Sequence, residues 1–346
     1  MNSPALIRWR SLLVLLFSTL SACHFQIPET NQPTSSLSVQ ASNTDPACKV
    51  VNHAWGKTEL CEQPQRIIAL DPHALDLLLS LNIQPIGYSE DSRALVGNPK
   101  LGQSVNGVKY LGDRLRSSPT HVGTWQTPSL ETMLGLKPDL ILSGYLDESQ
   151  YKNFSQLAPT LIPIDDWTSP KQWQDSLLLL GQILDRETQA QQAIDAYNRN
   201  VISTKNELIQ TGRQNVLLLS MTGLDDVGIF NHKTFAGAIL EDLGFELLVP
   251  NELSETNGEI VISLETLPQL RPDLIIVMAS GDSQVDQVKS VWEGNSVLRS
   301  LPAYQNDQVY FVDYHLWSRI QGAIAAELVI AQVREMLLNT KSVSAR

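Results

Sequence analysis

The chain is poor in basic residues, in cysteine and in long apolar runs. Its 346 residues include 25 lysines and arginines against 37 aspartates and glutamates, which gives a net charge of −12. Such a surface does not suit the phosphates of a nucleic acid, so we expect no nucleic-acid partner. The length suffices for one large or two medium-sized globular units. Both a binding protein and an enzyme remain open on these grounds.

Common short motifs of enzymes are also missing. The chain has no Gly-x-Ser-x-Gly, no P-loop, no Gly-x-Gly-x-x-Gly after a strand and no His-Glu-x-x-His. No two histidines stand at helical metal-ligand spacing, which disfavours a zinc or manganese site while leaving one assembled in space open. We therefore expect neither a resident cofactor nor a protein-bound metal. The six histidines are His24, His53, His73, His121, His232 and His315.

The first 22 residues are typical of an export signal. Arg8 and Arg10 precede a short apolar run, Leu12 to Phe17, which is far below the roughly 18 residues of a membrane span. The run leads into Leu-Ser-Ala-Cys, whose pattern indicates a lipoprotein signal cleaved before Cys23, with lipid on the cysteine sulfur. The alternative is an ordinary secretory signal. Residues 23–47, rich in Ser, Thr, Asn, Gln and Pro, are predicted to be a flexible tether.

Only three cysteines are present, and lipidation of Cys23 leaves Cys48 and Cys61. Two cysteines in an exported protein are more often paired than free. The segment between them has two short arms around Gly56-Lys57, a turn signal, so we predict a hairpin closed by a structural disulfide. Metal-cluster reductases need more cysteine ligands than this chain offers.

A thirteen-residue stretch occurs twice, as Ser129–Ile141 and Ser263–Ile275, with nine identical positions and an offset of 134 residues. Each copy begins with a serine that can cap a helix, continues with leucines at helical spacing, and stops at Pro-Asp before an apolar run. This predicts a short helix followed by a buried parallel strand. Solenoid repeats are roughly 20–50 residues long, so the offset indicates one lobe built twice.

The duplicated motif Glu-x-x-x-x-Leu-(Lys/Arg)-Pro-Asp-Leu-Ile resembles the binding proteins of ABC importers for ferric siderophores, cobalamin and heme. The resemblance extends from Cys48 to the last helix and is closest to iron-siderophore binders. It implies class III periplasmic-binding-protein architecture, an α/β fold with two doubly wound, Rossmann-like lobes joined by a single long rigid helix. The expected lobes are residues 48–168 and 213–346, with a helical linker over residues 169–212.

Pattern along the chain supports this layout. From Arg186, apolar residues at helical spacing (Ala190, Ile194, Tyr197, Val201 and Leu208) predict a helix of about 25 residues, roughly 37 Å long. A helix resists bending, so we expect modest lobe movement. Buried strands are predicted at residues 65–70, 85–88, 161–165, 215–220 and 308–313, and helices at 71–83, with Asp71 as a cap, 234–243 and 320–339.

Matching glutamates stand in the first turn of both repeated helices, Glu131 and Glu265. One such glutamate is explained by the helix dipole alone. Two on separate lobes fit the two halves of a dimeric partner with arginines, and the resemblance implies that they dock on the ABC permease dimer.

The ligand site is expected between the lobes, where loops follow strand ends. Seven tryptophans against seven phenylalanines is an unusual ratio, and several tryptophans fall in loops. Aromatic faces and arginines suit a bulky, partly anionic chelate whose metal needs no protein ligand. Arg114 and Arg116 are weaker candidates, better explained by a surface loop. The candidates are Tyr88, Arg93, Trp125, Tyr145, Trp167, Phe230, His232, Trp317 and Arg319.

We therefore expect a monomeric, lipid-anchored solute-binding protein of an ABC importer. It captures a ferric siderophore of hydroxamate or citrate type and hands it to the permease without making or breaking a bond. Cobalamin and heme are alternative ligands, and Tyr145 or His232 could serve heme as an axial ligand. The other open classes are an exported metal-chelate enzyme, resembling a chelatase or a reductase, and a tethered scaffold without a ligand.

Overall fold

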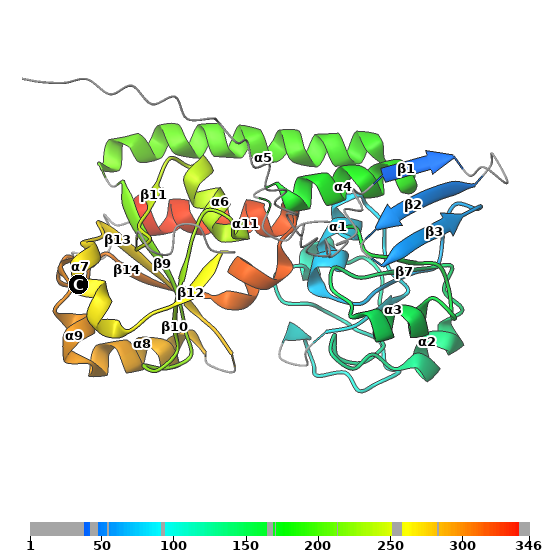
Figure 1. The fold of residues 1–346 in the computed structure, drawn as a ribbon, viewed down its shortest axis with the longest axis horizontal. Helices are drawn as coiled ribbons and strands as arrows, with labels where there is room; N and C mark the ends of the chain where they lie inside the picture. The colour runs from blue at the N-terminus through cyan, green and yellow to red at the C-terminus, as the bar shows by residue number, and fades with distance from the viewer. Residues whose placement is uncertain are drawn as a thin grey trace, which may run out of the picture. The chain divides into compact units, whose positions relative to one another are not determined.

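Two sheets with parallel strands at their centres follow one another along the chain (Figure 1). The structure is a computed structural model. It describes residues 38–41, 48–53, 55–90, 94–164, 169, 171–212, 214–250, 258–281 and 284–338. These residues belong to one compact unit, Ser35–Arg346. Within them, no helix combines the length and apolarity needed to cross a membrane. The predicted signal peptide, Cys23, Arg93 and Trp167 lie outside the described residues.

The first sheet has five parallel strands in the order β6-β5-β4-β7-β8. The strands are β4 (Ile67–Ala69), β5 (Gly87–Tyr88), β6 (Thr120–His121), β7 (Leu140–Leu142) and β8 (Thr160–Leu161). Because β5 and β7 flank the central strand β4, the chain reverses its direction of travel across the sheet at β4. In doubly wound sheets this switch point is where ligands bind, at the carboxyl ends of the strands.

Helices cover both faces of this sheet, as the alternation of side chains along β4 requires. Ile67 and Ala69 pack into one buried cluster, while Ile68 and Leu70 pack into another on the opposite face. The first cluster includes α1 (Pro72–Ser80) and α4 (Gln172–Ile183), and the second includes α2 (Leu130–Leu136) and α3 (Glu148–Phe154). As predicted, Asp71 caps α1, because its side chain accepts from the Ala74 N–H.

The second sheet has six strands in the order β12-β10-β9-β13-β14, with β11 also paired to β9. They are β9 (Asn215–Met221), β10 (Val227–Phe230), β11 (Glu246–Leu247), β12 (Glu259–Val261), β13 (Leu274–Ala279) and β14 (Val309–Asp313). Its helices are α6 (Phe235–Asp242), α7 (Leu267–Leu270), α8 (Val285–Gly294), α9 (Ser296–Arg299), α10 (Pro302–Gln305) and α11 (Ala323–Leu338).

This sheet is mixed, so it is not a simple copy of the first. Strands β9, β11, β13 and β14 are parallel, but β10 runs antiparallel to β9 and to β12. Only residues 222–226 separate β9 from β10, too few for the crossover that a parallel pair needs. The prediction of one lobe built twice is correct in that both lobes are α/β. It is wrong for β9 and β10, which form an antiparallel hairpin without a counterpart in the first sheet.

The long linker helix is α5 (Glu187–Leu208), with 22 residues, followed by the short 3₁₀ helix η3 (Ile209–Thr211). It begins one residue later than predicted and spans roughly 33 Å at about 1.5 Å per residue. Its Tyr197 ring packs edge-to-face on Trp173 of α4, and its hydroxyl donates to Asp242 of α6 at 2.6 Å. In Figure 1, α5 runs past α4 at one end and past α6 and α11 at the other.

A three-stranded antiparallel sheet precedes the first lobe, in the order β1-β2-β3. Its strands are β1 (Ser38–Ala41), β2 (Lys49–His53) and β3 (Gly56–Leu60). Two predictions need correction here. Ser38–Ala41 lies within the predicted tether but pairs with β2. Gly56 and Lys57, predicted to form the turn, belong to β3, because Gly56 pairs with His53 and the connection comes earlier. The predicted hairpin is otherwise present.

The duplicated stretch has a structural role at its Pro-Asp. Asp139 accepts from the backbone N–H groups of Gln65 and Arg66, just before β4. Asp273 accepts likewise from Gln214 and Asn215, at the start of β9. Each aspartate thus ties the amino end of its own strand to the central strand.

The helices of the two copies differ. Ser129 caps the continuous helix α2, whereas the second copy forms the 3₁₀ helix η5 (Leu264–Thr266) and the single turn α7. Pro268 stands near the start of α7, where its missing N–H is tolerated, but it cannot continue a preceding helix.

Candidate functional site

Side chains from the two lobes meet beyond the carboxyl ends of β5 and β14. Asp313, the last residue of β14, accepts from Lys109 at 2.5 Å and from the Tyr110 hydroxyl at 2.8 Å. Burial pushes the pKa of Asp313 upward, but hydrogen bonds from Lys109, the His315 backbone and Tyr110 outweigh it and hold the pKa below its ordinary value. The carboxylate therefore stays ionised and joins the lobes.

A second contact between the lobes lies beside it. Glu90, two residues past β5, is almost fully buried and accepts from the Tyr88 hydroxyl at 2.7 Å. Its carboxylate is 3.6 Å from Nε2 of His315 in the other lobe. Burial, followed by the charge of Glu90, raises the pKa of Tyr88 well above its ordinary value, so the phenol stays protonated and remains a donor.

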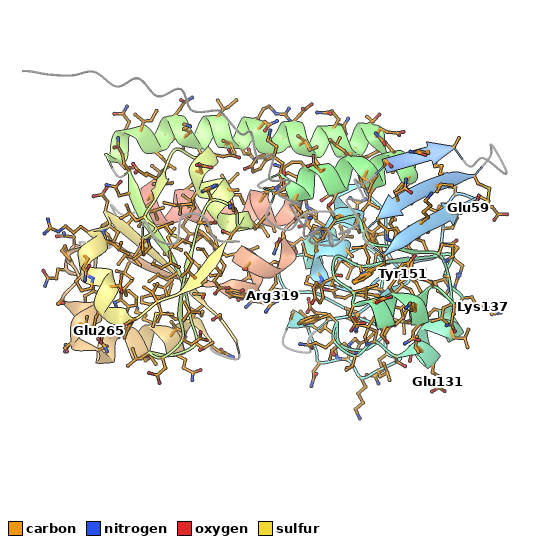
Figure 2. All side chains as sticks on the ribbon, in the orientation of Figure 1. Glu59, Glu131, Lys137, Tyr151, Glu265 and Arg319 are labelled. Carbon is orange, nitrogen blue, oxygen red and sulfur yellow. A yellow bond between two sulfur atoms is a disulfide. The ribbon has the colours of Figure 1, made fainter. Side chains whose placement is uncertain are left out.

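Arg319 is an exposed cation of this region, as is Lys109. It lies in the π-helical turn η6 (His315–Ile320) that connects β14 to α11, and π-helical turns are frequent at functional sites. Its Cζ is 5.7 Å from the ring centroid of Trp125 in the first lobe and 5.3 Å from that of Tyr314 in the second. Figure 2 shows Arg319 between the first and second sheets. A guanidinium on aromatic faces can recognise an anionic, partly apolar ligand.

The predicted ligand residues fall into two groups. Trp125 is half-buried, while Tyr145, His232 and Arg319 are exposed, with Tyr145 at 62 %. The structure brings Trp125 and Arg319 together, as a site between the lobes requires.

The second group is buried and already engaged. Tyr88 is the last residue of β5, not a loop residue, and its hydroxyl is bound to Glu90. Phe230 ends β10 and packs edge-to-face on Tyr314. Trp317 is fully buried and donates to Gln332 at 2.7 Å. Because the side chains of these three residues are buried, they offer little area to a ligand.

Sequence reasoning missed Tyr314, Asp313 and Glu90. All three end or follow a strand, so the rule that selected Arg319 could have found them. Tyr110 lies in a long loop of the first lobe, far in sequence from any strand end, and nothing local marks it. Arg114 forms an ion pair with Glu327 of α11 at 3.0 Å, and Arg116 is exposed.

A cavity of about 400 Å³ lies next to the Asp313 cluster, and a second of about 690 Å³ opens at the other end of the second sheet. Of the predicted ligand residues that the structure describes, none lines either cavity. The first is lined by Lys109, Tyr110, Val285, Phe311, Val312, Asp313, Gln332, Glu335 and Met336. The second is lined by Gly212, Pro268, Arg271, Pro272, Asp273, Pro302, Ala303 and Asn306.

Glu131 and Glu265 are both exposed. In Figure 2, Glu131 lies at the lower edge of the first lobe and Glu265 at the outer edge of the second, both on the side away from α5. Glu265 also accepts from the hydroxyl of Ser263.

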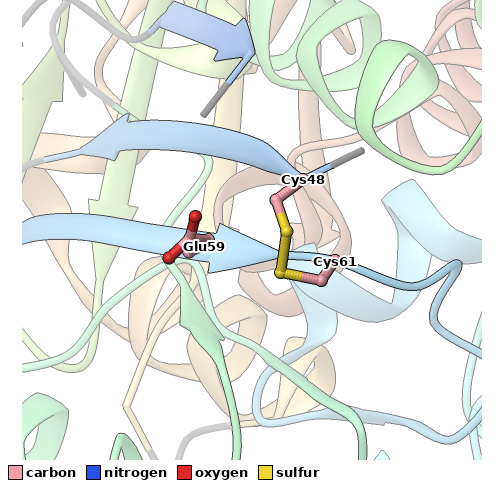
Figure 3. Close-up of side chains that lie close together, drawn as sticks. All are labelled: Cys48, Glu59 and Cys61. Atoms are coloured by element: carbon pink, nitrogen blue, oxygen red, sulfur yellow. A yellow bond between two sulfur atoms is a disulfide. The ribbon is translucent and has the colours of Figure 1, made fainter. Parts of the chain in front are cut away.

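Cys48, Glu59 and Cys61 lie close enough to suggest a metal site (Figure 3). The two sulfurs are joined in the predicted disulfide. A cysteine binds a metal as its thiolate. The disulfide offers none, so Glu59 alone is left as a metal ligand and we interpret this cluster as structural.

With its two α/β lobes and bridging helix, the protein has the architecture of class III binding proteins. Residues 67–315 match the family described as periplasmic binding protein. The chain belongs to this family, which is one of binding proteins.

Several curated relatives are named for binding ferric complexes. The Fe(3+)-citrate-binding protein YfmC of Bacillus subtilis is 26% identical over 293 residues, covering 84% of this chain and 86% of that protein. The Fe(3+) dicitrate-binding periplasmic protein FecB of Escherichia coli is 25% identical, with 82% and 90% covered. The crystal structure of Staphylococcus aureus SirA with staphyloferrin B superposes with a TM-score of 0.67 at 26% identity, covering 84% of this chain and 98% of SirA.

Proposed function

We propose that this protein is the substrate-binding component of an ABC importer and captures a ferric-siderophore chelate between its lobes. The observation that carries the proposal is the Arg319 guanidinium of the second lobe lying against the Trp125 ring of the first. Cation and aromatic surface from both lobes suit an anionic chelate that spans them. The relatives named for ferric citrate and for a siderophore support the same ligand class.

Among siderophores, we propose a citrate-type chelate in preference to a hydroxamate. Relatives named for ferric citrate reach 25–26% identity over more than four fifths of this chain, whereas a hydroxamate-binding relative reaches 23% over 75%. Carboxylates of the chelate would face Arg319, whose planar fork matches them.

Tryptophan fluorescence tests the ligand directly. Ferric citrate should quench the fluorescence saturably and be recovered chemically unchanged, while ferric hydroxamates, hemin and cobalamin should quench weakly or not at all. Arg319→Ala should weaken ferric citrate binding about tenfold, the effect of losing one charge-assisted contact. The matched control is Arg334→Ala, which removes an exposed arginine of α11 that is paired with Glu207 of α5. Equal affinity for ferric citrate in the wild type, Arg319→Ala and Arg334→Ala would contradict the role of Arg319 in ligand binding. Turnover of the chelate or tight binding of hemin would contradict the proposed ligand class.

Delivery to the permease is proposed to use Glu131 and Glu265. The acidic residues of the duplicated motif differ in their surroundings. Asp139 and Asp273 have a structural role in each copy, whereas the glutamates are exposed on the same side of the unit. Two exposed carboxylates of this kind suit arginines on a dimeric permease.

A transport assay separates docking from capture. Glu131→Ala together with Glu265→Ala should abolish uptake and leave ferric citrate affinity unchanged. The control replaces two other exposed first-turn glutamates, Glu148 of α3 and Glu187 of α5, and should transport normally. Normal uptake by the Glu131/Glu265 variant would refute the docking role.

Anchoring through lipid on Cys23 completes the proposal. Two curated relatives are named as lipoproteins, which supports export and a location outside the cytoplasmic membrane. A mass spectrum of the mature protein should show a lipidated N-terminal Cys23, and an unlipidated N-terminus would remove this part.

A further inference from the structure

The amino end of α1 contacts two elements that carry exposed candidate ligand residues, Tyr145 and Arg319. Asp71, at the cap of this helix, contacts the loop that carries Tyr145, and His73, two residues later, contacts the turn that carries Arg319. Both side chains are buried, and neither belongs to the ligand surface described above. α1 follows β4 directly, so it begins at the switch point of the first sheet, where the ligand site of a doubly wound sheet is expected.

Asp71 fixes the loop after β7 with one of its two oxygens. Oδ1 accepts from the Ala74 N–H and caps α1. Oδ2 accepts from the Gly144 N–H at 2.5 Å and from the Ser143 hydroxyl at 2.7 Å. Ser143 Oγ in turn accepts from the Tyr145 N–H. The backbone on the amino side of Tyr145 is therefore hydrogen-bonded to the buried side chains of Asp71 and Ser143, while the Tyr145 ring stays exposed.

The N-terminal hairpin holds the same loop from its other side. Trp55, between β2 and β3, donates its indole N–H to the Leu146 carbonyl at 2.9 Å. Asp147, the next residue, caps α3 in a capping box with Gln150. Tyr145 is thus an exposed side chain on a backbone that is bonded on both sides.

His73 makes the corresponding contact with the second lobe. Its Nδ1 is 2.9 Å from the Gln321 carbonyl and 3.2 Å from the Ile320 carbonyl, so this nitrogen carries the proton and donates. Nε2 accepts from the Gln172 side chain of α4. Burial lowers the pKa of His73, which keeps the ring neutral in this tautomer. Ile320 directly follows Arg319, so His73 fixes the end of the π-helical turn η6.

We propose that Asp71 and His73 are positioning residues that hold Tyr145 and Arg319 in mutual register for ligand binding. They act through the backbone of the elements that carry those side chains and do not touch the ligand. The proposal rests on the proposed function, which assigns Arg319 to the ligand, and on the sequence prediction of Tyr145, whose ring is exposed, as a further ligand residue. Preorganisation of this kind raises affinity because the ordering cost is met before binding.

A matched control exists in the same sheet. Asp139 also accepts two backbone N–H groups, those of Gln65 and Arg66, but at the amino end of the strands, away from the ligand site. Asp71→Asn and Asp139→Asn therefore remove the same kind of bond at opposite ends of one sheet. Ser143→Ala is a milder second variant, in case Asp71→Asn does not fold.

Affinity for ferric citrate and thermal stability are measured together for each variant. We expect Asp71→Asn, Ser143→Ala and His73→Gln to weaken binding about three- to tenfold, and Asp139→Asn to keep the wild-type affinity whatever its melting temperature. Equal affinity losses in Asp71→Asn and Asp139→Asn at equal loss of stability would overturn the proposal, because a purely structural role predicts that result.

Double-mutant cycles identify the side chain through which each residue acts. Replacing Asp71 should cost no further affinity once Tyr145 is alanine, and replacing His73 should cost none once Arg319 is alanine. Fully additive losses in both cycles would refute positioning. If wild-type protein binds no ferric chelate, the proposed function fails instead, so the two failures are distinct.

Discussion

Asp76 is expected to make the protein less stable as the pH rises from about 4 to about 6. Its side chain is fully buried between α1 and the start of α11, where it accepts from the N–H groups of Ile324 and Ala325 at 3.1 and 2.9 Å. Burial raises the pKa of this carboxyl from its ordinary 3.8 to about 6. The hydrogen bonds from Ala325, Ile324 and Ser80, and the charge of Arg114, act in the opposite direction without cancelling it.

The magnitude follows from the two pKa values. Between pH 3.8 and about 6 the folded protein keeps a proton on Asp76 that the unfolded chain has released. The free energy of unfolding therefore falls as the pH rises through this window and levels off above it. A difference of about 2 pKa units, at about 1.4 kcal/mol each, corresponds to roughly 3 kcal/mol.

Urea unfolding of the wild type and of Asp76→Asn measures this contribution. Asparagine does not titrate, so the stability difference, wild type minus variant, should shrink by about 3 kcal/mol between about pH 4 and about pH 7. A constant offset from the changed hydrogen bonds does not affect this slope. A difference that stays flat would show that the N–H groups of α11 cancel the effect of burial, and one that grows with pH would show that they outweigh it; either result would refute the reasoning.

Three further predictions concern stability and are tested by urea unfolding. Replacing Cys48 and Cys61 together by serine should lower the unfolding free energy by about 2–4 kcal/mol, because the disulfide closes a short loop of the unfolded chain; an unchanged midpoint would contradict this. Gly322→Ala should destabilise by about 1–3 kcal/mol, since the new Cβ would lie 2.2 Å from Asp76. Its control, Gly135→Ala, meets open space in α2 and should stabilise by about 0.5–1 kcal/mol; the same sign in both would be inconsistent with packing as the cause. Tyr197→Phe should cost about 1–2 kcal/mol through the lost bond to Asp242, and a loss below about 0.3 kcal/mol would mean that this bond contributes nothing net.

Much of the fold was predictable because its signals are local. Apolar runs such as the one around Ile67, and the stripe that contains Ala190 and Tyr197, depend only on neighbouring residues, and the structure places β4 and α5 there. The capping role of Asp71 is equally local. The hairpin β9–β10 was not predicted, because the duplicated motif favours a parallel repeat and the sign of the hairpin is only a five-residue connection, too short for a parallel crossover.

The candidate site was predictable only in part. Arg319 and Trp125 were selected as loop residues beside strands, and the structure brings them together. Tyr88 was selected by the same rule but lies in the last position of a fully buried strand. Position relative to a strand end is visible in sequence, whereas the direction in which a side chain leaves that end depends on what packs beside it.

The sequence by itself determined the α/β class, the long helix, the cysteine pair and the duplicated Pro-Asp that ends each repeated helix. Only the tertiary structure decided that Asp71 reaches Gly144 and that His73 reaches Gln321, 248 positions away. The physical reason is that a buried polar side chain takes whichever backbone group the packing presents to it. Such a partner can come from any part of the chain, so no local pattern in the residues specifies it.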